Sequence, residues 1–187
     1  FRNDCLVVVF GSNINFYDCY DFSLTYTTTN PIPHRFCVAL TQSGNYNLVA
    51  FPSPEGDQLC ISDYHDPKQV LGSIPIHFSH INYFTFDSKC ELLAIACDEG
   101  RIIQLWSVME LKLIAKFKRG FRTAEVSGLA FDHLSNYFIM TTKRGTMHVF
   151  EIPAQKDVKD QSKYIRSTFS LELQKGTEFH YQFDNAG

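Results

Sequence analysis

Short apolar runs separated by glycine turns recur along the chain with a period of about 45 residues. The glycines at turn-like positions are 45, 44 and 45 residues apart, and they are Gly11, Gly56, Gly100 and Gly145. Each glycine is preceded by one apolar run and followed by another, as in residues 92–97 and 102–106 on either side of Gly100. This pattern predicts a β-hairpin at every glycine.

A third apolar run lies upstream of the hairpins, as in residues 83–86 and 126–131, where Phe86 and Phe131 are again 45 residues apart. Three or four short strands per ~40–45 residues are typical of one propeller blade. Helical repeats of similar length need long amphipathic runs with a period of 3.6, and the sequence shows none. The pattern therefore predicts an all-β fold, a β-propeller.

The period breaks after Gly145. The next glycine followed by a matching strand is Gly176, only 31 residues further on, so roughly one strand and a turn are missing. At this period 187 residues supply about four to five blades, whereas propellers typically close with four to eight. We expect one partial propeller domain over residues 1–187, with a loop or a chain break within 153–175.

Composition narrows the function classes. The hydrophobic fraction of 44% and the aromatic fraction of 14% are typical of a globular protein and too high for a disordered one. The net charge of −3 provides no global field for nucleic acid or acidic membranes, so any anion site must be a local cluster. The six cysteines show no C-x-x-C spacing, which favours buried free thiols over a zinc site or a disulfide framework. We expect no metal and no cofactor.

One local cluster of positive charge lies between residues 111 and 124, where five basic residues and no acid occur: Lys112, Lys116, Lys118, Arg119 and Arg122. Taken alone, a short basic run is most simply a solvated edge. In an extended segment, however, Lys118 and Arg119 point to opposite sides and would serve two separate pockets. Gly120 would let the backbone pass close to a bound group.

A second cluster spans the hairpin around Gly145, where Thr142, Thr146 and His148 can converge. Each of these taken singly is most simply a strand-surface threonine or a histidine with a structural partner. Together with a guanidinium, hydroxyls and an imidazole are the groups that a multiply phosphorylated ring needs.

Four segments of the chain resemble the PROPPIN family: residues 113–120, 124–126, 129–131 and 145–150. The resemblance also covers residues 30–31, 37–40, 48–52 and 76–77, the last before the strand expected at 83–86, and so runs through nearly all of residues 1–153. The family consists of seven-bladed propellers that bind phosphatidylinositol 3-phosphate and 3,5-bisphosphate in autophagy and endolysosomal traffic. The resemblance implies that the family's first blades and part of its last lie outside this chain.

The family's hallmark is Phe/Leu-Arg-Arg-Gly, whose two arginines serve two headgroup sites. Here it reads Phe-Lys-Arg-Gly, so Arg119 matches the second arginine, and its partners match Thr142, Thr146 and His148. That site keeps its residue types.

The other site departs from the family pattern. Lys118 replaces the first arginine and loses the guanidinium fork, while Ile95 and Cys97 stand where the family has small hydroxyl residues. Gln104 stands in place of another arginine, and Gly100 is kept. The resemblance implies one working and one degraded site, with a set of candidate phosphoinositide-binding residues: Arg119, Thr142, Thr146, His148, Lys118, Gly120, His77 as a surviving contact and Arg101 as a replacement.

Residues 154–165 resemble the place of the family's membrane-contacting loop. Their sizeable apolar groups are Val158, Tyr164 and Ile165. An ordinary polar surface loop explains this segment at least as well as a segment that inserts into a membrane.

Three classes of function compete. A phosphoinositide-binding peripheral membrane scaffold explains the repeat, the basic motif and the hairpin cluster together. A generic WD-repeat-type scaffold for protein interaction, without lipid binding, explains only the repeat. Catalysis is not expected, because the sequence has no G-x-S-x-G, H-E-x-x-H or P-loop motif.

The resemblance also implies partners and a location. The expected partners are phosphoinositide headgroups and the autophagy lipid-transfer protein or other autophagy factors, with no nucleic acid among them. The expected location is cytoplasmic, with peripheral recruitment to autophagosomal precursor or endolysosomal membranes.

Overall fold

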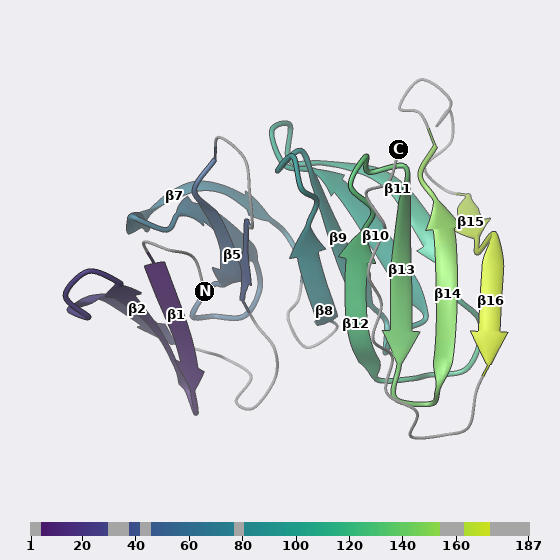
Figure 1. The fold of residues 1–187 in the computed structure, drawn as a ribbon, viewed down its shortest axis with the longest axis horizontal. Helices are drawn as coiled ribbons and strands as arrows, with labels where there is room; N and C mark the ends of the chain where they lie inside the picture. The colour runs from purple at the N-terminus through teal and green to yellow at the C-terminus, as the bar shows by residue number, and fades with distance from the viewer. Residues whose placement is uncertain (1–4, 30–37, 42–45, 77–80, 154–162, 173–187) are drawn as a thin grey trace. The chain divides into compact units, whose positions relative to one another are not determined.

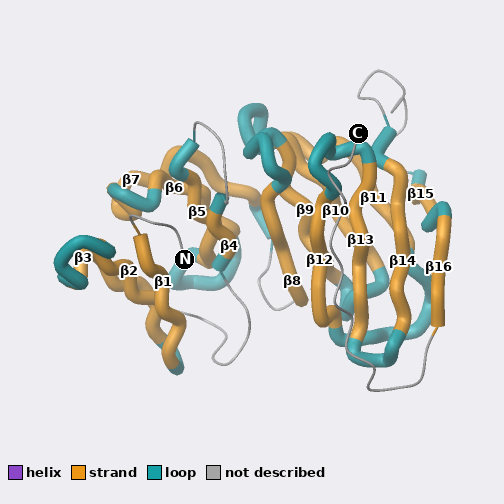
Figure 2. The backbone as a smooth tube through the Cα atoms, in the orientation of Figure 1, coloured by secondary structure: helices purple, strands orange, loops and turns teal. Residues whose placement is uncertain are grey.

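The computed structural model describes residues 5–29, 38–41, 46–76, 81–153 and 163–172. The chain divides into two compact units, Phe1–His80 and Ile81–Gly187. Strands and loops make up both of them, as Figure 2 shows, and the described residues contain no helix long and apolar enough to cross a membrane.

The first unit contains two antiparallel sheets (Figure 1). The three-stranded sheet has the order β1-β2-β3, with β1 (Cys5–Phe10), β2 (Asn13–Asp18) and β3 (Leu24–Thr29). The four-stranded sheet has the order β4-β5-β6-β7, with β4 (Ala39–Leu40), β5 (Leu48–Pro52), β6 (Leu59–Asp63) and β7 (Asp66–Ile74). Each strand pairs with the next one along the chain, as in a propeller blade.

The second unit also contains two sheets. The first is built from β8 (Ile81–Phe86), β9 (Leu92–Cys97), β10 (Ile102–Ser107) and β11 (Lys112–Lys118). The second is built from β12 (Val126–Phe131), β13 (Tyr137–Thr142), β14 (Thr146–Glu151) and β16 (Phe169–Glu172). The short β15 (Tyr164–Arg166) adds a fifth strand to the first sheet, parallel to β11.

The predicted glycine turns are confirmed. All four glycines have positive φ, at 58° (Gly11), 73° (Gly56), 74° (Gly100) and 79° (Gly145), and each lies in the turn between two paired strands. In three of these turns the glycine N–H donates to the carbonyl three residues earlier, at 2.9 Å from Gly56, 3.1 Å from Gly100 and 3.0 Å from Gly145. The period therefore repeats a left-handed glycine in all four turns, and one hydrogen-bond geometry in three of them.

The core of the second unit lies between its two sheets. Phe117 from β11 meets Phe138 at 4.8 Å and Phe150 at 5.6 Å between ring centroids, both edge-on. Ile103 and Leu105 on β10 face the same core. Because strand residues alternate, the inward position of Phe117 places Lys118 on the opposite face of its sheet.

The segment after β14 holds two short strands, where a regular repeat would begin a new blade. Within 153–175, where a loop or a chain break is expected, residues 154–162 and 173–175 lie outside the described part of the chain, whereas residues 163–172 hold β15 and β16. The strand expected after Gly176 lies outside it as well. The single partial domain over 1–187 stays a prediction.

The Gly100 turn provides a stability test. A Cβ at Gly100 would lie 2.2 Å from the carbonyl oxygen of Ala124, whereas one at Gly11 meets nothing within 4 Å. Both glycines have positive φ, so Gly11→Ala costs only the left-handed backbone strain of about 1–2 kcal/mol. Gly100→Ala adds a clash with backbone and should cost about 1–3 kcal/mol more in the free energy of unfolding. Denaturant titration of the full-length variants measures both values, and equal losses would contradict the contact.

Candidate functional site

Residues 119–125 link β11 to β12 and are held by backbone hydrogen bonds from both sides. On one side, Arg119 N–H donates to Arg101 O at 2.9 Å and Ala124 N–H donates to Glu99 O at 3.0 Å. On the other side, Lys143 N–H donates to Glu125 O at 2.9 Å. The linker therefore lies between the β9–β10 turn and the β13–β14 turn.

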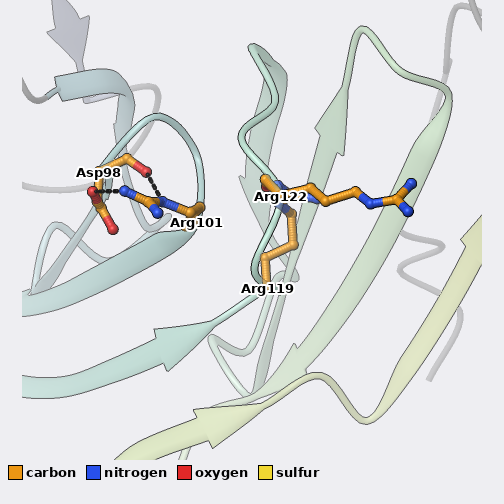
Figure 3. Close-up of polar contacts among 4 residues, drawn as sticks. All are labelled: Asp98, Arg101, Arg119 and Arg122. Atoms are coloured by element: carbon orange, nitrogen blue, oxygen red, sulfur yellow. Dashed lines mark hydrogen bonds and ion pairs between the residues drawn. The ribbon is translucent and has the colours of Figure 1, made fainter.

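Arg119 uses its guanidinium to complete this attachment. Its Nε donates to the carbonyl of Gly100 at 2.7 Å, and its Nη2 donates to the carbonyl of Arg122. Figure 3 shows these two arginines at the linker. Burial lowers the pKa of Arg119, and the positive charge of Arg144 lowers it further. The neighbouring charge that acts on this half-buried guanidinium is thus another cation.

The hairpin between β13 and β14 supplies the neutral groups. The Thr142 and Thr146 hydroxyls are 2.7 Å apart, and Thr146 N–H donates to Thr142 Oγ1 at 3.4 Å. His148 pairs with Met140 in the β13–β14 register, so Thr142, Thr146 and His148 share one face of the sheet. That face is the one that meets Phe117.

His148 is the least satisfied group of this face. Both of its ring nitrogens are buried and have no hydrogen-bond partner within the described residues. Burial and the positive charge of Arg119 lower its pKa to about 4. The imidazole is therefore neutral at physiological pH and lies within electrostatic reach of Arg119.

The structure thus brings Arg119 and His148 together, with Thr142 and Thr146 on the same face as His148. It adds Arg144, which belongs to the hairpin cluster and stands beside Gly145 but was not among the candidate phosphoinositide-binding residues. It also adds two residues from β16, because Ser170 pairs with His148 and Glu172 with Thr146. The local sequence contained no signal for these last two, since the pairing of β16 with β14 depends on the path of the chain.

Lys118 lies in different surroundings. It pairs with Ile102 on β10 and with Arg166 on β15, on the opposite face of the sheet from Phe117. Its Nζ lies 4.2 Å from the ring centroid of Phe121 and 5.8 Å from that of Tyr164. Neither Arg166 nor Phe121 was identified from the sequence, whereas Tyr164 was named there only as an apolar residue of the segment 154–165.

The positions of this second face where the family has hydroxyl or arginine side chains are apolar or neutral here, although Lys116 pairs with Gln104 on the same face. Ile95 is fully buried, and Cys97 is 5% exposed. Burial raises the pKa of the Cys97 thiol to about 12, with a further contribution from Asp98, so the thiol stays protonated. Gln104 accepts a hydrogen bond from Trp106 Nε1 at 3.0 Å.

Arg101 and Gly120 can be placed, whereas His77 lies outside the described residues. Arg101 turns back on its own loop, where its Nη2 lies 2.6 Å from Asp98 Oδ1 and its Nε donates to Asp98 O at 3.2 Å (Figure 3). Its charge is therefore balanced within the turn. Gly120 has open space where a Cβ would stand, and its φ lies outside the left-handed region. Neither packing nor backbone conformation requires a glycine there.

Two of the three apolar residues expected in the loop belong to β15. Ile165 packs against the core of the second unit, and Tyr164 is 46% exposed beside Lys118. The Ile165 side chain thus has a structural role. Val158 lies outside the described residues.

Comparison with known proteins agrees with this architecture. No family model matches the chain. Autophagy-related protein 18 of Yarrowia lipolytica is 27% identical in an alignment of 172 positions that covers 80% of this chain and 42% of that protein. The resemblance to the PROPPIN family is confirmed.

Solved structures show the fold. The structure of Kluyveromyces lactis Hsv2p matches with a TM-score of 0.71 at 13% identity, covering 95% of this chain and 57% of that one. A complex of KlAtg21 with the coiled-coil of AgAtg16 matches with a TM-score of 0.69 at 23% identity, covering 82% and 51%. The predicted all-β propeller is confirmed, with the four sheets as its blades. The chain spans less than half the length of the first curated relatives that it matches.

The lowered pKa of His148 predicts a pH-dependent stability. Between about pH 6.5, its ordinary value, and about pH 4, the unfolded chain binds a proton that the folded chain does not, so stability falls as pH falls through this range. His148→Gln removes this contribution. The decrease in melting temperature of the full-length protein from pH 7.5 to pH 5.0 should therefore be smaller for this variant than for the wild type. The control variant His133→Gln changes an exposed histidine and should show the same decrease as the wild type. The same decrease in melting temperature for all three proteins would contradict a buried neutral imidazole at His148.

Proposed function

We propose that this chain is the headgroup-binding part of a peripheral membrane scaffold in autophagy or endolysosomal traffic, and that the site around Arg119 binds a phosphoinositide. The observation that carries the proposal is a half-buried guanidinium with a second arginine, Arg144, as its charged neighbour, next to a buried imidazole that lacks a partner. Two like charges at this place favour a bound anion, because the anion relieves their repulsion.

The available hydrogen-bond donors suit a phosphate. A guanidinium has five N–H groups, and Arg119 uses Nε and one at Nη2 on backbone carbonyls, which leaves others for phosphate oxygens. The Thr142–Thr146 hydroxyl pair can turn one O–H outward, and His148 can donate from one ring nitrogen. A phosphorylated inositol ring offers acceptors for all of these groups at once.

The relatives support the setting of this function. They are named for autophagy, and one related structure holds a coiled-coil partner. We therefore assign the protein a scaffolding and not a catalytic role, with autophagy factors as protein partners. The corresponding location is the cytoplasm, with recruitment to autophagosomal precursor or endolysosomal membranes.

Alanine substitutions at the two faces test the proposal. Arg119→Ala should weaken binding to vesicles containing phosphatidylinositol 3-phosphate roughly tenfold or more, because a charged phosphate contact is worth about 1.5–3 kcal/mol. Lys118→Ala should weaken it less, since Ile95 and Cys97 offer its face no hydroxyl groups. Flotation of the full-length proteins with vesicles of graded lipid content measures both effects.

A second variant separates binding from folding, because Arg119 also holds the linker. Arg144 is exposed, and Arg144→Ala should weaken vesicle binding several-fold without lowering the melting temperature. Wild-type binding by both arginine variants would remove the lipid proposal and leave a scaffold for protein interaction alone. Equal losses from Lys118→Ala and Arg119→Ala would show that the degraded face binds as well.

Gly120 provides an independent steric test. Since its Cβ position is open and its φ is not left-handed, Gly120→Ala should change the free energy of unfolding by no more than about 0.5 kcal/mol. If the backbone passes close to a bound headgroup, the added methyl should weaken binding of soluble inositol 1,3-bisphosphate several-fold. Calorimetric titration of the full-length protein measures this, and unchanged affinity would mean that the headgroup stays away from Gly120.

A further inference from the structure

Phe121 is a large apolar side chain left almost entirely in solvent. It is 79% exposed and stands two residues after Arg119. Its ring lies 4.2 Å from the ammonium of Lys118, which in turn lies 5.8 Å from the ring of Tyr164. The ammonium of Lys118 thus lies near two aromatic rings, of which one is exposed and the other half-exposed.

Three chain segments build this group. Lys118 ends β11, Phe121 lies on the linker, and β15 contributes Tyr164 and Arg166. The parallel register sets Arg166 directly beside Lys118, and Arg166 is exposed. We name Lys118, Phe121, Tyr164 and Arg166 the aromatic–cation cluster.

We propose that the aromatic–cation cluster is a contact with the bilayer interface, where Phe121 enters the lipid below the headgroups and Lys118 and Arg166 meet lipid phosphates. This inference rests on the proposed function, since the Arg119 site supplies the headgroup that brings the cluster to the membrane. It assigns a membrane contact to the linker next to the headgroup motif.

The chemistry of the cluster fits a lipid surface. An aromatic ring gains free energy by leaving water, whereas an ammonium or a guanidinium needs an anionic or aqueous neighbour. The boundary between headgroups and acyl chains offers both within a few ångströms, and Phe, Lys and Arg are the residues that interfacial segments use there. The contact between Lys118 and the Phe121 ring lets both groups enter the interface together.

The position of Phe121 on the chain fits as well. Two residues span at most about 7 Å, so a headgroup on Arg119 holds Phe121 within that distance of the phosphate layer. Interfacial apolar groups reach about 5–10 Å into the same boundary. A ring placed this close to a bound headgroup needs no further movement of the fold to reach lipid.

The test compares two ligands on the full-length protein. Phe121→Ser should weaken binding to phosphatidylcholine vesicles containing phosphatidylinositol 3-phosphate about tenfold, the loss expected when roughly 1.4 kcal/mol of apolar burial is removed. The affinity for soluble inositol 1,3-bisphosphate should stay within about twofold. Phe121→Trp should keep vesicle binding and should show a blue shift of its added fluorescence with vesicles only.

Tyr20→Ser is the matched control, since Tyr20 is an 86% exposed aromatic in a turn of the first unit, and it should change neither affinity. Wild-type vesicle binding by Phe121→Ser would overturn the inference. An equal loss of affinity for the soluble headgroup would also overturn it, because Phe121 would then be part of the headgroup site. A loss of affinity seen only for a coiled-coil protein partner would overturn it as well. Failure of the proposed function looks different: the wild type would then not bind the soluble headgroup, while Phe121-dependent binding to phosphatidylserine vesicles would persist.

Discussion

The placement of Arg119 depends on how the β9–β10 turn holds the linker. Three consecutive residues of this turn, Asp98, Glu99 and Gly100, have positive φ, at 51°, 53° and 74°. For the two residues other than glycine this conformation costs about 1–2 kcal/mol each. The carbonyls of Glu99, Gly100 and Arg101 each accept a hydrogen bond from the linker, and these bonds offset the strain.

The alternation of strand β11 then gives the two motif cations different surroundings. Phe117 is fixed by the aromatic rings of the second sheet, so the next residue faces away from that sheet. Lys118 finds aromatic rings and a neighbouring arginine there. Arg119 instead reaches backbone carbonyls, a second arginine and a neutral histidine. Lys118 and Arg119 are adjacent and carry like charge, but they lie in different surroundings because the packing of Phe117 fixes the direction of each.

The sequence predicted the features that depend on local periodicity. Residue alternation and the glycine spacing were sufficient for the strands, the four turns and the shared face of Thr142, Thr146 and His148. The two short strands after β14 could not be predicted this way, because β15 joins a sheet whose other strands end at Lys118. Arg166, and the position of Tyr164 beside Lys118, were missed for that reason.

Arg101 shows a second limit of periodicity. Its position next to the Gly100 turn was clear from the sequence, but its direction depends on an ion pair with Asp98 that competes with any bound anion. Residue type and spacing do not decide such a competition, since either partner would satisfy the guanidinium. The expected identity of the Arg119 partners rested on the family resemblance, whereas the action of the Arg144 charge on Arg119 emerged only from the fold.

The segment that follows residues 154–162 has a mechanical consequence. Within ten residues it pairs with β11 through β15 and with β14 through β16, and Thr168 N–H donates to Val149 O at 2.8 Å between them. Blades of a repeat fold commonly open one after another, because each contacts only its neighbours. Here a single short stretch of backbone closes the outer edges of two blades. We therefore expect fraying of either edge to disrupt the other, and the two blades to open and exchange their amide protons as a single foldon.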